Sequence, residues 1–346
     1  LGQFFYINKE EINTSLKKIE GKTNETTDTN LKIPVRGRIQ LTAIASNIKD
    51  LIEYEKFYLP GTYSIKDLLV INNKIFVSFT NEQSDNCFNT SIIVAEIKLN
   101  FFKFTNFFPH KECNSLGTDK TTNPQHGGGR MFLFKNEKIL LTIGDYGTRS
   151  KAQNEKSIFG KIISIDLASK DYEIIAMGSR NAQGLYYDEE ADVILHTEHG
   201  PRGGDEININ LHPNSETVKN FGWPHAFYGT LSDGTKLPNS HKDFGFVEPI
   251  KYFTPGIGIS EIIKIPRFIN PQFTNDFLVA AMGWSGELND GDRSLHHLRF
   301  NKNFDQIIFE NVIPIDERIR DMIFVKDSNL LLLILESMPA LGIIKF

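Results

Sequence analysis

The sequence of 346 residues has few cysteines, no long apolar run and no excess of basic charge. Its two cysteines are too few for a disulfide-framed scaffold or a thiolate metal site. The longest apolar runs, such as Leu330 to Leu335, span six residues, whereas a membrane-spanning helix needs about 20. Acidic residues (43) outnumber basic ones (38), so we expect no nucleic-acid partner. The remaining composition, 40% hydrophobic and 23% charged, is typical of a globular protein.

Two features bear on the cellular compartment. Cys87 and Cys113 form one disulfide in an oxidising compartment or stay as free thiols elsewhere, and the sequence leaves both open. The chain begins with Leu1 rather than Met, which suggests that an upstream signal or membrane anchor was removed, although a trimmed sequence would look the same. We therefore expect a periplasmic or extracellular protein, with a membrane tether upstream of residue 1 as one form of it.

The chain divides into a polar N-terminal segment and a β-rich remainder. Residues 7–35 are rich in Lys, Glu, Asn and Thr, which predicts a loosely held arm with one short helix around Glu10 to Ile19. From Gly37 onward, short apolar runs are broken by Gly, Pro, Asn and Asp, a pattern typical of an all-β fold. We therefore assign residues 1–36 to an arm or linker and residues 37–346 to a β domain.

A weak internal repeat predicts the architecture of that domain. Five units of strand, polar turn and strand begin at residues 68, 131, 185, 262 and 322, which are 63, 54, 77 and 60 residues apart. Propeller blades have four strands in about 40–50 residues, and longer periods indicate loop insertions. Strands near Arg38–Ala45 and Gly342–Phe346 are expected to pair and close a sixth blade. The sequence thus favours a six-bladed β-propeller, with a pair of β-sandwiches as the alternative.

The repeat also predicts where functional side chains gather. His126, Arg180 and Arg318 lie four or five residues before the strand starts of three units, and equivalent positions of a propeller meet on one face near the axis. Glycine-rich segments follow the second strands, at residues 144–147, 198–206 and 283–287, and glycine permits close backbone approach to a ligand. A base, two cations and an acidic loop on one face predict a ligand site.

Several segments, in the same order, resemble the soluble aldose sugar dehydrogenases that depend on pyrroloquinoline quinone (PQQ), the glucose/sorbosone dehydrogenase family. They are His126-Gly-Gly-Gly-Arg130, Thr142-Ile-Gly-Asp145, Phe159-Gly-Lys-Ile162, Gly178-Ser-Arg-Asn-Ala-Gln-Gly184, the run from Glu198 to Asn208, Asn220-Phe-Gly-Trp-Pro224 and Arg318-Ile-Arg-Asp321. The resemblance covers roughly residues 60–346. It implies an oxidoreductase, a quinoprotein, that oxidises an aldose at C1 to its lactone.

The resemblance implies roles for individual residues. His126 matches the general base that takes the proton from the C1 hydroxyl as hydride moves to PQQ. Arg180 and Asn181 match residues that contact the cofactor, and Arg318 and Arg320 match a pair that faces the PQQ carboxylates, although an ion pair with the neighbouring Asp321 would explain these arginines equally well. The expected partner is a small sugar, and the electron acceptor is left open.

Calcium is the second cofactor that the resemblance implies. The carbonyls of Gly200 and Pro201 match ligands of an active-site ion, and Glu206 with the carbonyl of Phe221 matches a second, structural position. Oxygen ligands of this kind suit a hard cation. A plain tight turn, with glycines that serve backbone geometry, is the alternative for this loop.

Two differences from the family pattern support another function. The position of a PQQ-contacting lysine is occupied by about Gly283, and a glutamine expected before the first hairpin is replaced around Thr62. Both changes remove polar contacts to PQQ. The alternative is therefore a catalytically inactive, calcium-binding propeller that binds a glycan or a protein partner.

Overall fold

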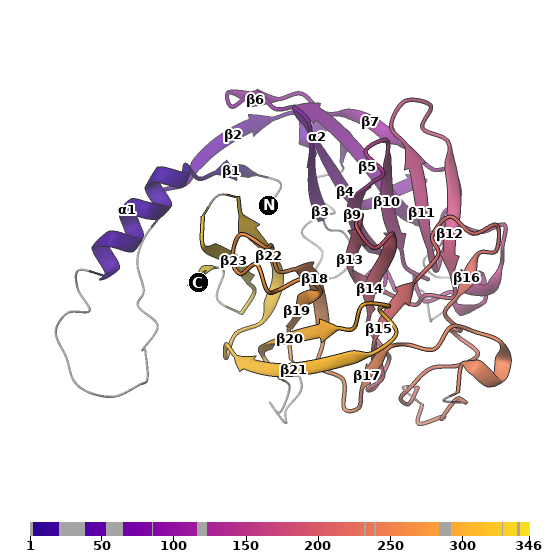
Figure 1. The fold of residues 1–346 in the computed structure, drawn as a ribbon. Coiled ribbons are helices and arrows are strands. Elements are labelled where there is room, and N and C mark those ends of the chain that lie inside the picture. The colour runs from indigo at the N-terminus through magenta and orange to yellow at the C-terminus, as the bar shows by residue number, and fades with distance from the viewer. Residues whose placement is uncertain are drawn as a thin grey trace.

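The computed structural model describes residues 3–20, 39–52, 65–84, 86–115, 123–231, 233–238, 240–283, 292–326, 328–337 and 340–346, and within these ranges the strands form six sheets arranged as the blades of a β-propeller (Figure 1). This confirms the predicted fold class. None of the helices in these ranges has the length and apolar character needed to cross a bilayer.

Five of the sheets begin with the hairpins that the repeat predicts. Their strands, in sheet order, are β3 (Ile65–Ile71), β4 (Lys74–Ser84), β5 (Cys87–Glu96) and β7 (Thr105–Phe108), with β8 (Asn114–Ser115) also on β5; β9 (Gly128–Phe134), β10 (Lys138–Ile143), β11 (Lys161–Asp166), β12 (Tyr172–Met177) and β16 (Lys219–Asn220); β13 (Ala182–Asp188), β14 (Val193–Glu198), β15 (Asp205–Asn210) and β17 (Lys251–Phe253); β18 (Ile259–Lys264), β19 (Asp276–Ala281), β20 (Ser294–Phe300) and β21 (Ile307–Pro314); and β22 (Ile319–Val325), β23 (Leu330–Leu335) and β24 (Ala340–Lys345). Short 3₁₀ helices lie at Arg149–Gln153 and Lys242–Phe244.

The sixth sheet differs from the prediction. It consists of β1 (Phe4–Tyr6), β2 (Thr42–Ser46) and β6 (Phe101–Phe102), in which β2 is antiparallel to β1 and parallel to β6, whereas β24 pairs with β23. The expected pairing of the two chain ends is therefore wrong. The physical reason is burial, because Phe4, Ile44 and Phe102 pack into one apolar cluster with the β3–β4–β5 blade.

The short helix predicted in the arm is present as α1 (Lys9–Glu20), which lies outside the ring of blades (Figure 1). The Lys9 ammonium links this helix to the propeller, because it donates to the carbonyl of Lys326. A second, one-turn helix, α2 (Ile48–Leu51), follows β2. Residues 21–38 of the predicted arm lie outside the described ranges, and so does the position near Thr62. The two cysteines are joined, Cys87 at the start of β5 to Cys113, which resolves the alternative that the sequence left open.

Hydroxyl side chains of the first or second strands link four blades to the blade that follows. Each hydroxyl donates to a carbonyl of the first strand of the following blade: Ser78 to Gly129 (2.5 Å), Thr142 to Ala182 (3.2 Å), Thr197 to Ser260 (2.5 Å) and Ser260 to Ile319 (2.6 Å). Buried hydroxyls must find such partners, so these contacts fix the spacing of neighbouring blades. The inner strands are thereby held around one axis.

The first strand of every hairpin also carries a register irregularity near its beginning. The ladders shift between Ile65 and Asp67, between Ala182 and Gly184, between Ile259 and Ile262, between Ile319 and Asp321, and opposite Thr142 in the β9–β10 pair. A β-bulge of this kind leaves one residue outside the ladder and re-aims its side chain. In three blades that residue is Lys66, Gln183 or Arg320.

A buried arginine, Arg130 of β9, joins the inner strands below these bulges. Its guanidinium contacts Asp321 (2.9 Å), Glu261 (3.0 Å) and Asp67 (3.4 Å), and it donates to the carbonyls of Gln183 and Arg320 (2.7 Å each). Burial raises the pKa of Asp67 to about 6 and the pKa of Glu261 to about 8, because three carboxyl groups share one cation away from water. One side chain thus contacts strands of four other blades.

Candidate active site

One end of the propeller axis collects the predicted functional residues. His126, Arg180 and Arg318 directly precede or lie near the starts of β9, β13 and β22. Because each hairpin is antiparallel, the residues that follow the second strands, such as Glu198 and Glu336, reach the same end.

His126 lies between an acid and a cation. Its Nδ1 is 3.4 Å from Oδ1 of Asp145, and its Nε2 is 3.0 Å from Nη2 of Arg180 and 3.3 Å from Nδ2 of Asn123. Burial lowers the pKa of His126, Arg180 and Lys66 lower it further, and Asp145 opposes them. The imidazole is therefore neutral near pH 7, and a proton on Nδ1 facing Asp145 leaves the lone pair of Nε2 as the acceptor.

Asp145 orients His126 and is itself fixed. Its Oδ2 accepts from the indole of Trp223 (2.8 Å), its Oδ1 accepts from the backbone of Gly147 (2.7 Å), and the carboxylate is fully buried. The sequence reasoning quoted Asp145 within a matching segment but assigned it no role. The sequence signal for a role of Asp145 was its place directly after the second strand of the hairpin that His126 precedes.

Arg180 connects the imidazole to the glycine-rich loop. Its Nη1 donates to the carbonyls of His199 (2.9 Å) and Gly200 (3.3 Å), while Nη2 faces His126. The guanidinium carbon lies 5.6 Å from the ring centre of Trp223, and burial lowers the pKa of Arg180. The Arg180 guanidinium therefore contacts both the lone pair of His126 Nε2 and the carbonyl of Gly200, which is one of the predicted calcium ligands.

Asn181 lies next to Arg180, with its amide held by neighbouring groups. Its Oδ1 accepts from the backbone of Gly128 (3.2 Å) and from Nε2 of Gln183 (2.9 Å). Gln183 in turn lies at 3.5 Å from Nη1 of Arg320. Asn181 and Arg320 are thus brought together through one amide side chain.

Arg318 and Arg320 share an acid that the sequence reasoning did not select. Glu336 lies 2.6 Å from Nη2 of Arg320 and 3.6 Å from Nη2 of Arg318. Asp321, the alternative partner that the sequence left open for these arginines, contacts Arg130 instead, because the bulge at Arg320 turns it in that direction. Nη1 of Arg318 donates to the carbonyls of Met282 and Gly283 (3.0 Å each).

A pocket of about 210 Å³ opens beside Arg318. Gly200, Pro201, Asp205 and Gly283 line it together with Arg318. It therefore joins one predicted cofactor-binding arginine to two predicted calcium ligands and to the position where the family lysine is replaced.

The four predicted calcium ligands line a second, much smaller cavity of about 10 Å³. Gly200, Pro201, Glu206 and Phe221 share it with Glu198. The sequence placed these ligands in two separate positions, and the structure brings all four to one cavity, with Gly200 and Pro201 shared with the Arg318 pocket.

The chemistry of this cavity suits a hard cation. Oε2 of Glu198 and Oε1 of Glu206 are buried and lack hydrogen-bond partners among the described residues. Burial raises the pKa of Glu206 well above its ordinary value, and the neighbouring Glu198 raises it further. No cluster of three or more acidic, histidine or cysteine ligands occurs in the part of the chain that the structure describes, so an ion here would rely on two carboxylates and on carbonyls.

Lys66 is a site residue that the sequence reasoning missed. It is the bulged residue of β3, and its side chain runs along the backbone of Gly129 and Gly127, toward His126. Burial, and after it the positive charge of Arg320, lower the pKa of Lys66 to about 8. The signal was the match between Ile65-Lys66-Asp67 and Ile319-Arg320-Asp321, which occupy equivalent positions in their blades.

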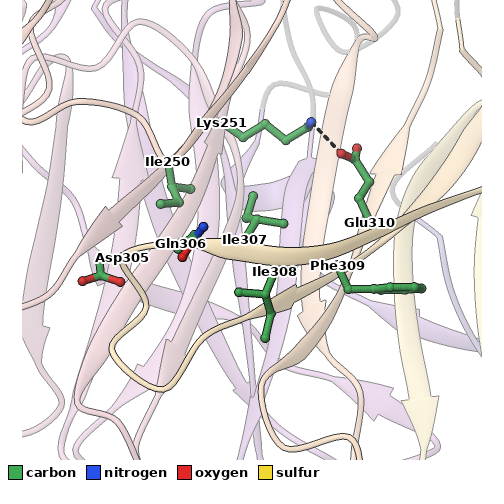
Figure 2. Close-up of a pocket in the computed structure, with 8 residues that line it drawn as sticks. All are labelled: Ile250, Lys251, Asp305, Gln306, Ile307, Ile308, Phe309 and Glu310. Carbon is green, nitrogen blue, oxygen red and sulfur yellow. Dashed lines mark hydrogen bonds and ion pairs between the residues drawn. The ribbon is translucent and has the colours of Figure 1, made fainter.

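A separate groove lies at the rim of the propeller. Ile250, Lys251 and residues 305–310 line it, and the ion pair of Lys251 with Glu310 (2.8 Å) borders it (Figure 2). Since β17 and β21 are the last strands of their sheets, this groove belongs to the outer edge and not to the axis.

Comparisons with known proteins give one family and one fold. The sequence model of the family described as Glucose / Sorbosone dehydrogenase matches residues 69–341. The chain is 32% identical over 226 residues to an uncharacterized protein of Synechocystis sp., and 25% identical over 227 residues to the aldose sugar dehydrogenase YliI of Escherichia coli. These alignments cover 57% and 61% of this chain, but only 50% and 58% of those proteins.

Solved structures resemble the whole propeller. A glucose dehydrogenase superposes with a TM-score of 0.67 at 22% identity, over 84% of this chain and 83% of that chain. The apo form of the soluble aldose sugar dehydrogenase from Escherichia coli gives 0.63 at 22% identity, over 80% and 81%. The PQQ-bound aldose sugar dehydrogenase from Streptomyces coelicolor gives 0.57 at 16% identity, over 85% and 78%. At these identities the likeness establishes the fold.

Proposed function

Because the chain belongs to the glucose/sorbosone dehydrogenase family, we propose that it is an oxidoreductase that converts an aldose to its lactone at C1, with PQQ and Ca²⁺ as cofactors. The observation that carries this proposal is the arrangement of His126, a neutral imidazole that faces Asp145 with one nitrogen and the guanidinium of Arg180 with the other. The same proposal includes a periplasmic or extracellular location, a small sugar as the substrate and a separate electron acceptor.

His126 acts as the general base. Oxidation at C1 removes a proton from the hydroxyl oxygen and a hydrogen with its electron pair from carbon, so a base beside the hydroxyl lowers the barrier. Nε2 takes the proton, while Asp145 stabilises the imidazolium that forms. When bound, PQQ supplies the two-electron oxidant that accepts the C1 hydride, and the sugar leaves as the lactone.

Arg180 must change its contacts during this cycle. In the structure its guanidinium faces Nε2 of His126 and the carbonyl of Gly200 at once. A sugar hydroxyl at Nε2 and a cation at Gly200 both compete with it. Once displaced from the lone pair, Arg180 can hold an oxyanion near the imidazole, which is the role that an arginine performs well in a partly buried site.

Arg318 and Arg320 provide fixed positive charge for the carboxylates of PQQ. Their guanidinium groups share only Glu336 as an acid among the described residues, so charge remains for an anionic ligand. Asn181 adds an amide beside them. The cavity of Glu198 and Glu206 would hold Ca²⁺, whose charge compensates two buried carboxylates.

A catalytically inactive propeller that binds a glycan or a protein partner is the second candidate. The observation in its favour is Gly283, whose carbonyl accepts from Arg318 at the position where the family has a lysine. In this second candidate the cavity still binds calcium, but the protein does not bind PQQ.

The Cys87–Cys113 disulfide supports a periplasmic or extracellular location, because such bonds persist in oxidising compartments. A membrane tether upstream of residue 1 fits the same location.

The test combines binding and turnover. Calorimetric titration of the protein with PQQ, with and without Ca²⁺, should give tight, calcium-dependent, one-to-one binding, and a dye-linked assay should then detect oxidation of an aldose. His126→Ala should abolish turnover while it preserves PQQ binding, and His212→Ala, an exposed histidine away from the axis, is the matched control. Unchanged turnover in His126→Ala would refute the mechanism. Absence of PQQ binding would instead favour the inactive propeller.

A further inference from the structure

The side chain of Lys66 follows a path that the glycine run before β9 leaves open. A Cβ atom placed on Gly129 would lie 2.3 Å from Cβ and 2.6 Å from Cγ of Lys66, and one placed on Gly127 would lie 3.1 Å from its Cε. Real Cβ atoms essentially never come within 3.0 Å of another heavy atom, and the backbone of Gly129 has a φ of +104°, so position 129 requires glycine beside Lys66. The side chain of Lys66 therefore packs along the backbone of the segment from His126 to Arg130, and its ammonium group lies toward the imidazole of His126.

Lys66 ends among cations. Within the described ranges no acidic side chain lies at ion-pair distance from it, and its ammonium donates no hydrogen bond. The other lysines near the blade interiors are satisfied, since Lys161 donates to three carbonyls and Lys264 pairs with Asp188. Its own neighbour Asp67 faces Arg130 instead.

The groups that face Lys66 come from two other blades. Arg320 of β22 is close enough to lower the pKa of Lys66, and Lys66 in turn lowers the pKa of His126. The one acid beside Arg320, Glu336, is shared with Arg318. Lys66, Arg320 and Arg318 therefore have one carboxylate among them in the described residues, that of Glu336, and a half-buried ammonium without a counter-charge is costly unless an anion joins it.

We infer that Lys66 and Arg320 together bind a carboxylate group of the ligand at the mouth of the propeller axis. This inference rests on the proposed function, since PQQ is the tricarboxylate that would supply the group. Arg320 offers a planar fork for two carboxylate oxygens, and Lys66 adds a point charge from a different blade. A cation contributed by β3 would supply positive charge that Gly283 cannot.

The experiment is calorimetric titration with PQQ at pH 8 in two buffers of different ionisation enthalpy, which reports both affinity and proton uptake. Lys66→Met should weaken binding about 10- to 100-fold, as loss of a charge-assisted hydrogen bond does, and Lys66→Arg should keep affinity within about fivefold. Because the Lys66 pKa is about 8, the free protein is half-protonated there and should take up about half a proton on binding. That uptake should vanish in Lys66→Met.

Two controls separate charge from folding and this inference from the proposed function. Lys74→Met removes an exposed lysine of β4 in the same blade and should behave as the unmodified protein, while thermal unfolding checks that all variants fold. Titration with inorganic phosphate forms the second arm. If PQQ binds with equal affinity and proton uptake in Lys66→Met, the inference is overturned and the proposed function stands. If phosphate binding depends on Lys66 but PQQ does not bind, the anion site stands and the proposed function falls. If the unmodified protein binds neither, both are overturned.

Discussion

Arg130 on β9 and Asp321 on β22 form an ion pair of 2.9 Å, although 191 residues separate them in sequence. The same guanidinium reaches Glu261 on β18 and Asp67 on β3, so one side chain neutralises acids of three blades. The inner strands are thus joined by a buried cluster of charged side chains and not by apolar packing alone. Its stability therefore depends on every member being present.

Replacement of Arg130 by Met should cost about 3–5 kcal/mol of unfolding free energy or prevent folding, because it leaves buried carboxylates without a counter-charge. Chemical unfolding followed by tryptophan fluorescence measures the loss. Arg267→Met is the matched control, since Arg267 pairs with Glu190 at the surface and should contribute under about 1 kcal/mol. A loss at Arg130 no larger than the one at Arg267 would contradict the role given to the cluster.

Glu261 should make the protein less stable as the pH rises from 5 to 8. Its pKa is raised from 4.5 to about 8 in the folded state, chiefly by burial, so the folded state binds more protons than the unfolded state across this range. Glu261→Gln mimics the protonated form and should remove this part of the slope. Guanidinium unfolding at each pH compares the two proteins.

Glu310 is the control for that comparison, because its effect on stability changes with pH in the opposite direction. The Glu310 pKa is lowered beside Lys251 and His296, despite some burial, so its contribution is lost as the pH falls, and Glu310→Gln should flatten the acid side instead. Parallel curves for the unmodified protein and Glu261→Gln would show that Glu261 is ionised in the folded state.

Arg180→Gln should raise the pKa of His126, because the positive charge beside Nε2 disappears while Asp145 stays. NMR titration of the imidazole protons measures the pKa directly. In a turnover assay the acidic limb of the pH profile should move to higher pH, since the base must be neutral. Arg267→Gln serves as the control, and an unchanged or lower His126 pKa in Arg180→Gln would mean that the contact with Nε2 does not form in solution.

Calcium should raise the midpoint of thermal unfolding, and a chelator should reverse the effect. At 100 times the dissociation constant, a ligand that binds only the folded state adds about 2.7 kcal/mol. Glu206→Gln should abolish most of this gain, and binding should release a proton because the Glu206 pKa is raised in the free protein. Mg²⁺ should stabilise less, since it demands a stricter geometry than carbonyls and two carboxylates offer. An equal calcium effect in Glu206→Gln would place the ion elsewhere.

The five hairpins were predictable because a strand, its turn and its partner strand are close in sequence and share one apolar pattern. The sixth sheet was not, since β1, β2 and β6 pair across long separations and are placed by where Phe4 and Ile44 find apolar cover. The acid beside Arg320 was not predictable from the neighbouring position of Asp321, because the bulge in β22 turns Asp321 toward Arg130.

Residues that match family motifs were placed in the site in advance, whereas Lys66 was not. Its neighbourhood depends on the register of β3 against β4 and on three glycines 61 to 63 positions later. Such long-range placement cannot be read from a local pattern. Comparison of equivalent blade positions, Lys66 with Arg320, is the step that would have revealed it.

The bulge at the start of the inner strands gives adjacent residues different roles, one toward the ligand and one in the ion cluster. Lys66 and Arg320 point toward the mouth of the axis, while the next residues, Asp67 and Asp321, hold Arg130 beneath it. Ligand preference can therefore change by substitution at one position of a blade without disturbing the ion cluster that keeps the blades together. A propeller built in this way can diverge in chemistry faster than in architecture.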